Sequence, residues 1–363
     1  MERMSTKVVP PRHLRSFKTV LICGGSGFIG SNFVRHYYHA HPDARVVNLD
    51  LLTYAGSPEN LADIDRLEAS QKSSMRRYRF VKGDICDASL LDRIFTKHKP
   101  DLIVNFAAES HVDRSIVSYF DFVRTNIEGV RSLLEASRAH QVGRFIQIST
   151  DEVYGDVARG GATEEAPFRP SNPYAASKAG ADLLVQSYIR THRAPAIIIR
   201  GSNNYGPYQY PEKLIPLAVT NMLEGRKIPI HGGGRHIRSW LHVLDFCSAI
   251  NLIAHNASDN SIYNVSGEQK RNIEVLAMFA HHLGKDLSAS KEHIGDRPGA
   301  DMRYAPDSSK LKRELGWRPT HTLAGSIGDI ATWYATNTSW WHKIKRTKKF
   351  MDHYKRQSRA AWH

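Results

Sequence analysis

The sequence predicts an α/β protein in which a doubly wound parallel sheet precedes a smaller C-terminal lobe. Short apolar runs alternate with stretches of helical period through the first half, and after about Gly201 this rhythm gives way to loops rich in Gly, Pro, Asn and Tyr. Alternating strands and helices are typical of a parallel sheet covered by helices on both faces. The 363 residues, 41% of them hydrophobic, suffice for one large core or two unequal lobes.

The individual elements follow from these runs. We expect strands at 19–23, 45–49, 78–82, 102–106, 145–149 and 196–199. Helices are expected at 28–39, 89–98, 119–140 and 174–191, with shorter ones at 214–224 and 272–283. These elements divide the chain into an N-terminal extension (1–17), a sheet domain (18–200), a lobe that partly returns to that domain (201–341) and a basic tail (342–363).

The net charge of +14 lies mostly at the two ends of the chain. The tail from His342 onward is net +7, and residues 1–18 are net +4, so the part between them is almost neutral. A folded nucleic-acid module is therefore not indicated. We expect a solvated or partly disordered tail whose deletion leaves turnover unchanged. The alternative is contact with RNA, anionic lipid or a partner, and it is supported by Trp340, Trp341 and Trp362.

Neither a membrane span nor a metal or disulfide framework is indicated. No window holds the roughly 18 uninterrupted apolar residues of a membrane helix, and the polar start lacks the apolar run of a signal peptide. Cys23, Cys86 and Cys247 are far apart, which favours three buried thiols. We therefore expect a cytoplasmic protein without a bound metal.

A glycine-rich turn follows the first predicted strand directly and opens the first predicted helix. In Gly24-Gly25-Ser26-Gly27-Phe28-Ile29-Gly30, Gly24 permits the tight turn, Gly27 lets a pyrophosphate approach the backbone, and Gly30 lets helix and strand pack closely. Asp50 ends the second strand 20 residues later, where a carboxylate accepts hydrogen bonds from ribose hydroxyls and repels a 2′-phosphate. The pattern predicts a Rossmann-type site for NAD rather than NADP, although Arg45 weakens the distinction.

A tyrosine and a lysine form the first part of the predicted catalytic group. Tyr174 and Lys178 are four residues apart and so share one face of a helix. We expect Lys178, with oxidised nicotinamide, to lower the pKa of Tyr174 enough for it to act as a base near neutral pH.

These features together resemble the extended short-chain dehydrogenase/reductase family over roughly residues 18–318. Thr150-Asp151-Glu152 is similar to the motif of the nucleotide-hexose 4,6-dehydratases, in which an acid and a base stand side by side for the elimination of water. Further stretches that resemble the enzymes of this kind acting on dTDP-glucose are 50–56, 107–115, 202–208 and 211–216.

The resemblance implies roles for individual residues. Catalysis would fall to Thr150, Asp151, Glu152, Tyr174 and Lys178. NAD would be bound by Gly24, Gly27, Phe28, Ile29, Gly30, Asp50, Thr53, Tyr54, Ala55, Asp84, Ile85, Ala107, Ala108, Ser110, Thr125, Tyr174, Lys178 and Asn204. The sugar nucleotide would be bound by His111, Thr150, Asn203, Lys213, Leu214, Pro229, His231, Arg238, Asn272 and Arg297, with the two arginines on its diphosphate.

Three positions in the second lobe depart from the family pattern. Ser239 stands where the family usually has Asp, His231 where it commonly has Tyr, and Ala300 where it has His. These changes leave the redox and elimination residues untouched, so they bear on the nucleobase and the sugar.

The implied reaction is the conversion of a nucleoside-diphosphate glucose, in the first place dTDP-glucose, into its 4-keto-6-deoxy derivative and water, as in deoxysugar biosynthesis. UDP-glucose is the alternative substrate. An epimerase or decarboxylase of the same fold would need only Thr150, Tyr174 and Lys178, and a non-catalytic NAD-binding protein that uses its basic tail is the remaining alternative. By resemblance, helices 119–140 and 174–191 would pair across a two-fold axis as a four-helix bundle in a homodimer.

Overall fold

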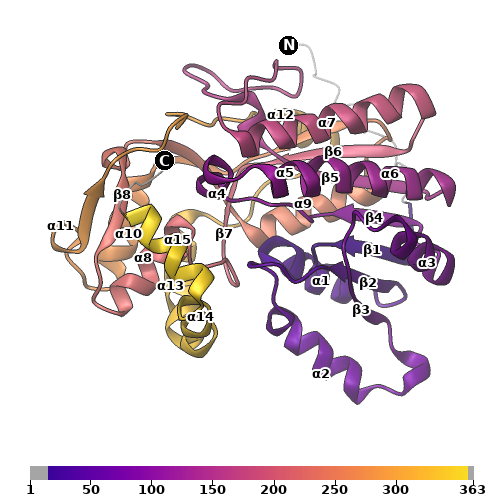
Figure 1. The fold of residues 1–363 in the computed structure, drawn as a ribbon, viewed down its shortest axis with the longest axis horizontal. Helices are drawn as coiled ribbons and strands as arrows, with labels where there is room; N and C mark the ends of the chain where they lie inside the picture. Colours follow the sequence, from indigo (N-terminus) through magenta and orange to yellow (C-terminus); the bar gives the residue numbers. More distant parts are fainter. Residues whose placement is uncertain (1–14, 359–363) are drawn as a thin grey trace, which may run out of the picture.

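A seven-stranded parallel sheet forms the centre of the larger lobe (Figure 1). The computed structural model describes residues 15–358. Across the sheet the strands are β10 (Ile262–Val265), β6 (Ala196–Gly201), β5 (Arg144–Thr150), β4 (Leu102–Asn105), β1 (Thr19–Cys23), β2 (Arg45–Asp50) and β3 (Tyr78–Lys82). All six predicted strands belong to this sheet. The order reverses between β1 and β4, and this is the point at which such sheets bind ligands at the carboxyl ends of their strands.

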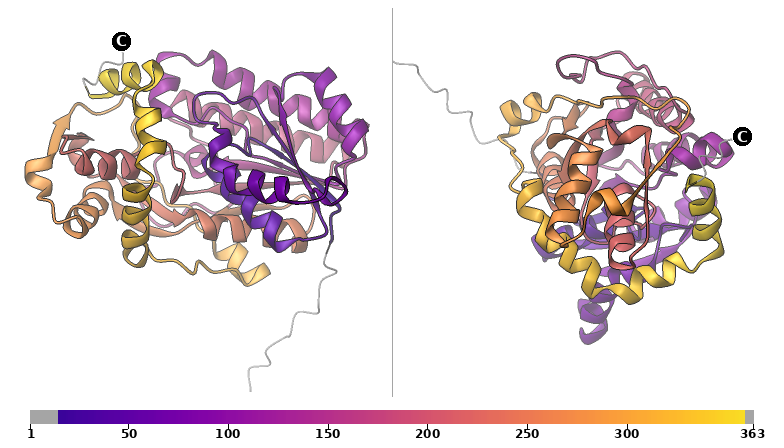
Figure 2. Two further views of the ribbon diagram at one scale, coloured as in Figure 1. Left: turned by 90° about the horizontal axis from the view of Figure 1, so that it is seen from below. Right: turned by 90° about the vertical axis from the view of Figure 1, so that its left-hand side faces the viewer.

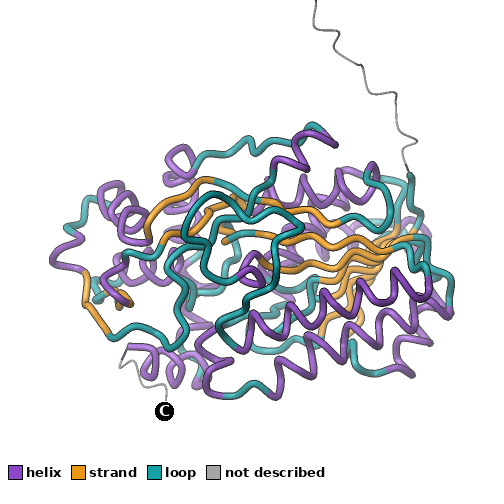
Figure 3. Tube along the Cα trace, turned by 90° about the horizontal axis from the view of Figure 1, so that it is seen from above, coloured by secondary structure: helices purple, strands orange, loops and turns teal. Residues whose placement is uncertain are grey.

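Helices cover both faces of the sheet, as predicted (Figure 3). One face packs on α1 (Phe28–Ala40) and α9 (Val243–Asn256), and the other on α3 (Ala88–His98), α6 (Gly129–Ala139) and α7 (Pro173–His192). Successive residues of β1 point to opposite sides, so Val20 and Ile22 belong to the first core layer and Leu21 and Cys23 to the second. The sheet is therefore apolar on both faces.

The predicted helix at 119–140 contains a π-helical turn. α5 (Phe120–Val123) leads through this turn at Arg124–Glu128 into α6, without a break in the helical path. π-turns are rare and often occur at functional sites. Here the turn carries Thr125, which faces the first cavity described below.

The second lobe is built from short elements around its own core. Its strands are β7 (Asn203–Tyr205), β9 (Ile237–His242) and β11 (Glu268–Arg271) in one sheet, and β8 (Ile228–His231) and β12 (Lys291–Ile294) in another. Its helices are α8 (Leu214–Leu223), α10 (Asn272–His282), α11 (Leu287–Ser290) and α13 (Leu323–Thr336). The chain returns to the larger lobe with α9, β10 and α12 (Ser309–Leu315). Two short helices, α2 (Ala62–Ser70) and α4 (Val112–Val117), complete the larger lobe.

The expectation of a solvated tail is wrong for residues 342–358. They form the end of α14 (Thr338–Lys345) and α15 (Lys348–Ser358), which run along the junction of the two lobes (Figure 2). Trp340 and Trp341 are buried in the core of the second lobe, and Phe350 is 3% exposed. The error arose because charged residues occupy the outer face of an amphipathic segment and dominate its composition.

Parts of the basic ends lie outside the described residues, among them Arg3, Lys7, Arg12 and Trp362. Between residues 15 and 358, no helix combines the length and apolar character that crossing a membrane requires.

Candidate active site

The glycine turn has the geometry that its sequence predicts. Gly24 has a φ of 76°, and a Cβ there would lie 2.6 Å from the backbone nitrogen of Ala107. A Cβ on Gly30 would lie 2.1 Å from the carbonyl oxygen of Gly24, whereas one on Gly27 would come no closer than 3.4 Å to its nearest neighbour. Gly24 and Gly30 therefore serve the packing of the turn, and Gly27 keeps space open at the start of α1.

Asp50 lies at the carboxyl end of β2, beside this turn. Its two carboxylate oxygens accept hydrogen bonds from the backbone nitrogens of Ser26 (2.9 Å) and Leu52 (2.8 Å). Burial raises its pKa above the usual value, while these two hydrogen bonds oppose the shift. Arg45 begins the same strand, roughly 17 Å away at 3.3 Å per residue, so it does not offset the charge of Asp50.

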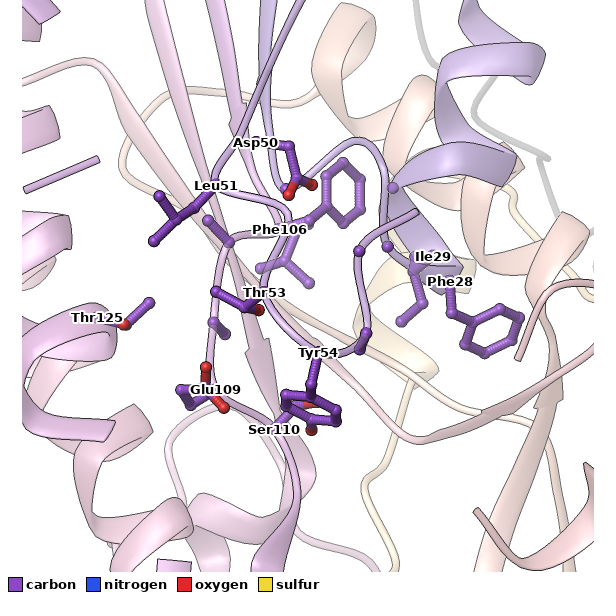
Figure 4. Close-up of a pocket in the computed structure, with 18 of the residues that line it drawn as sticks. Phe28, Ile29, Asp50, Leu51, Thr53, Tyr54, Phe106, Glu109, Ser110 and Thr125 are labelled. Carbon is purple, nitrogen blue, oxygen red and sulfur yellow. The ribbon is translucent and has the colours of Figure 1, made fainter. Parts of the chain in front are cut away.

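A first cavity extends from the glycine turn toward the end of β5. Figure 4 shows its labelled side chains around one elongated space, with Asp50 at one end and Tyr54 and Ser110 at the other. Every residue that the sequence places at the cofactor lines this cavity except Asn204, which lines the second cavity instead. An elongated space with an open glycine at a helix N-terminus and a carboxylate at one end fits a dinucleotide.

Tyr174 and Lys178 project from the first turns of α7 into this cavity. The helix begins at Pro173, and the Asn172 side chain caps it by accepting a hydrogen bond from the backbone nitrogen of Ala175. The Lys178 Nζ donates to the carbonyl oxygen of Ile148 at 2.6 Å, and burial lowers the pKa of Lys178 to about 8.

The prediction that Lys178 and oxidised nicotinamide together lower the pKa of Tyr174 stays a prediction, and the protein's own groups act in the opposite direction. Burial raises the pKa of this phenol, and the nearby Glu152 carboxylate raises it further. A hydrogen bond with Thr150 lowers the pKa of Tyr174 and so opposes this rise. The Lys178 ammonium donates its hydrogen bond to the backbone of β5. The protein alone therefore keeps Tyr174 protonated.

The acid and base of the predicted motif follow β5 in a single turn. The Thr150 hydroxyl accepts a hydrogen bond from the backbone nitrogen of Glu152 at 3.3 Å and so shapes this turn. Asp151 is 3% exposed, and its burial, together with the charge of Glu152, raises its pKa to about 8. This shift favours the acid form of Asp151 near neutral pH, the form that can donate a proton.

Glu152 faces the second cavity, and two polar side chains lie within hydrogen-bonding distance of the same oxygen. Its Oε2 accepts from the Asn172 side-chain nitrogen at 3.3 Å and lies 3.2 Å from the Tyr304 hydroxyl, which shares its single proton with the closer Asp301 Oδ2 at 2.8 Å. The turn after β5 thus places a carboxyl with a raised pKa next to a hydrogen-bonded carboxylate.

The second cavity lies between the lobes and adjoins the first, because Ser110, Gln209, Glu212 and Lys213 line both. All predicted sugar-nucleotide residues line it except Thr150, which is buried beside Tyr174. These residues are His111, Asn203, Lys213, Leu214, Pro229, His231, Arg238, Asn272 and Arg297.

Cations give the second cavity its electrostatic character. Lys213, Arg238 and Arg297 line it, and the Arg297 Nε is buried without a hydrogen-bond partner. Arg297 also forms an ion pair with Asp113 through its Nη1 at 3.2 Å. A buried guanidinium edge beside two further cations is suited to a diphosphate.

The three departures from the family pattern have different surroundings. His231 and Ala300 line the second cavity, so they can contact a ligand there. Ser239 is 1% exposed, and its hydroxyl donates to the carbonyl oxygen of Tyr304. Ser239 can therefore affect the site only through the backbone that carries Tyr304.

Sequence reasoning missed four residues at the site. Asn172 and Tyr304 hold Glu152, Glu212 lies between the cavities, and Gln357 of α15 lines the second cavity. Glu212 lies within the stretch 211–216, in which only Lys213 and Leu214 were predicted to bind the substrate. Asn172 could have been found as the N-cap before Pro173. Nothing in the local sequence around Tyr304 or Gln357 indicates their long-range contacts.

A doubly wound sheet, a glycine turn at its first strand and a buried Tyr–Lys pair on α7 place the chain in the extended short-chain dehydrogenase/reductase class. The chain belongs to the GDP-mannose 4,6 dehydratase family, which matches it over residues 21–330.

Individual relatives agree with this placement. The chain is 44% identical to a dTDP-glucose 4,6-dehydratase of Streptomyces niveus over 90% of its own length and 95% of the relative's. It is 43% identical to one of Neisseria meningitidis serogroup B, covering 90% of this chain and 96% of that one. A crystal structure of the dTDP-glucose 4,6-dehydratase DesIV from Streptomyces venezuelae, solved with NAD and a second ligand bound, superposes with a TM-score of 0.85. That comparison has 44% identity and covers 90% of this chain and all of the other.

Proposed function

We propose that the protein is an NAD-dependent hydro-lyase that converts dTDP-glucose into the 4-keto-6-deoxy sugar nucleotide and water. One observation carries this proposal: Asp151, a buried carboxyl whose pKa is raised to about 8, stands next to the Glu152 carboxylate and within the same buried group as Thr150 and Tyr174. Elimination of water needs an acid and a base on one substrate at the same time. Relatives over 40% identical along 90% of the chain carry the name of this activity.

The two cavities divide the binding of the reactants. We assign NAD to the first cavity, with Asp50 on the adenosine ribose and the glycine turn at the pyrophosphate. The sugar nucleotide belongs in the second cavity, with its diphosphate on Arg238 and Arg297. Segment 18–200 then serves mainly the cofactor, and 201–341 mainly the substrate.

The chemistry follows from the position of each side chain. Bound in the first cavity, NAD⁺ would accept the hydride from C4 and return it to C6, and its positive charge would lower the pKa of Tyr174. Tyr174 takes the proton of the C4 hydroxyl, while Thr150 hydrogen-bonds to the oxygen that becomes a ketone. The ketone acidifies the proton on C5, which Glu152 removes while Asp151 protonates the departing C6 hydroxyl. Glu152 then returns its proton to C5, and transfer of the Tyr174 proton to Asp151 by way of solvent restores both groups, with no net consumption of cofactor.

The nucleobase is tested by a substrate screen. Purified protein is incubated with dTDP-, UDP-, GDP- and CDP-glucose, and the alkali-induced absorbance of a 4-keto product is measured. We expect the largest kcat/KM with dTDP-glucose. A signal with UDP-glucose alone would identify UDP-glucose as the substrate. NAD binding with no keto product from any of the four sugar nucleotides would contradict the proposal that the protein is a dehydratase.

An epimerase of the same class is the second candidate, because Thr150, Tyr174 and Lys178 would serve it equally well. It would not need an acid–base pair at 151 and 152. Product analysis by NMR separates the two: an epimer that retains its C6 hydroxyl would refute the elimination.

We also propose a homodimer formed through α5, α6 and α7. Large apolar side chains are exposed on α5 and α7 and just before α5: Val117 (43%) at the end of α4, Tyr119 (66%), Phe120 (69%), Val123 (45%) and Leu183 (57%). Such a concentration of apolar surface favours association. Light scattering at micromolar concentration tests it, and a monomer would contradict it. The cytoplasmic location stays a prediction, which imaging of tagged protein in its host would check.

A further inference from the structure

The last described helix, α15, packs on the body of the protein through one face. Phe350, His353 and Gln357 are spaced three and four residues apart, and all three are buried. Phe350 packs with Tyr210 and Leu217. The opposite face is exposed and carries the ion pair between Lys348 and Asp352. The helix is therefore held in a defined position by this buried face.

This position brings Gln357 to a buried carboxylate at the second cavity. The Gln357 Nε2 donates to the Oδ2 of Asp113 at 3.0 Å, although the two residues are 244 positions apart. Asp113 is 1% exposed and belongs to α4. Its other oxygen, Oδ1, accepts from the Arg297 Nη1 at 3.2 Å. Asp113 thus connects the C-terminal helix to the guanidinium that lines the cavity.

Both oxygens of Asp113 are needed to keep Arg297 in place. A fully buried carboxylate is costly unless its oxygens are hydrogen-bonded. With Gln357 on one oxygen, the other is free to orient Arg297, whose Nε has no hydrogen-bond partner and is buried at the cavity. Loss of the Gln357 amide would leave Asp113 under-satisfied, and the carboxylate could then rotate away from its alignment with Arg297.

Gln357 lies beyond the residues that the family model matches, which end at residue 330. We propose that Gln357 is a positioning residue for the sugar nucleotide: through Asp113 it fixes the guanidinium of Arg297 that receives the diphosphate. The C-terminal helix is then one wall of the substrate site and sets its affinity. This inference rests on the proposed function, because it assigns an anionic nucleotide to the second cavity.

A metal ion is a less suitable occupant of the same cluster. Side-chain atoms of His111, Asp113 and His353 come within 4.8 Å of one another. However, Arg114, Lys213 and Arg297 all lie close enough to His111 to lower its pKa, and Asp113 is already engaged by Arg297 and Gln357. A divalent cation would meet three positive charges there.

The test uses the full-length protein and the Gln357→Leu variant, which keeps the volume of the side chain and removes its amide. Met351→Ala, on the exposed face of the same helix, is the matched control. We expect the KM for dTDP-glucose and the Kd for dTDP to rise about tenfold in Gln357→Leu, since one hydrogen bond to a charged group is lost. The kcat and the NAD content should stay close to those of the control, whereas the melting temperature should fall because Asp113 loses one of its hydrogen bonds.

A second variant separates positioning from packing. If Gln357 acts through Arg297, Gln357→Leu should add little to the loss already caused by Arg297→Ala, whereas independent contributions would add fully. Full additivity, or an unchanged KM in Gln357→Leu alone, would overturn the proposal. Failure of the wild-type protein to bind any nucleoside-diphosphate hexose would overturn the proposed function as well. This outcome is distinguished from the others because it is measured on the wild type alone.

Discussion

At the scale of single residues, Asp151 and Glu152 have separate roles that substitution can resolve. Neither group takes part in the first hydride transfer, so Asp151→Asn and Glu152→Gln should still oxidise C4 and retain NAD. Dehydration should fall by about 10²-fold or more, as expected for the loss of a general acid or base. The measurement is NADH absorbance in a single turnover, with the trapped 4-keto-hexose identified by mass spectrometry. Wild-type turnover in both variants would remove the pair from the mechanism.

The raised pKa of Asp151 also predicts how stability depends on pH. Burial raises the pKa of this carboxyl from 3.8 to about 8 in the folded protein, so the unfolded chain loses its proton first as the pH rises. The wild type therefore loses stability between about pH 4 and pH 8. Asp151→Asn does not titrate, so its melting temperature should exceed that of the wild type by an amount that grows across this range. If the difference in melting temperature between Asp151→Asn and the wild type is the same at pH 5 and at pH 8, Asp151 is ionised in the folded state.

At the scale of elements, the turn between β1 and α1 separates folding from cofactor binding. A Cβ at position 30 would collide with the carbonyl oxygen of Gly24, so Gly30→Ala should cost about 1 to 3 kcal/mol of stability. Gly27 has extended backbone angles and room for a methyl group, so Gly27→Ala should fold normally. The methyl would fill the space at the start of α1, and NAD affinity should fall about tenfold or more.

Thermal melting and NAD titration of the two glycine variants check this contrast. Gly27→Ala with the affinity of the wild type would mean that the pyrophosphate does not approach this turn. Gly30→Ala with the stability of the wild type would mean that α1 can shift away from β1.

At the scale of the whole molecule, the C-terminal helices hold the two lobes together and close the substrate site. Deletion of residues 342–363 removes Phe350 from a buried cluster and Gln357 from Asp113. We expect a loss of about 2 to 4 kcal/mol of stability, mainly from the exposed apolar surface, together with weak sugar-nucleotide binding. This replaces the sequence-based expectation that the deletion leaves turnover unchanged.

A control distinguishes packing from charge in this segment. Lys348 is exposed and pairs only with a neighbouring turn of its own helix, so Lys348→Ala should change stability by less than about 1 kcal/mol. Melting temperature and KM are measured for both proteins. If the truncated protein has the melting temperature and KM of the wild type, the tail contributes to solubility alone.

Much of this protein can be predicted from its sequence, because the signals are local. The glycine turn, Asp50 at the end of a strand, Tyr174 and Lys178 on one helical face, and the Asp151–Glu152 turn each depend on the spacing of a few neighbouring residues. In a parallel sheet these strand ends meet at one edge, so the residues gather in one site once the alternation of strands and helices is recognised.

Only the tertiary structure determines which residues from distant segments of the chain contact one another. It placed Tyr304 beside Glu152, Asn204 in the second cavity and α15 on Asp113, and it buried Tyr174 so that the protein's own groups raise the pKa of this phenol. Each of these depends on burial and on contacts between residues far apart in the chain. Burial determines the pKa of a group and the cost of an unpaired carboxylate, and burial is a property of the packed molecule rather than of any short stretch of sequence.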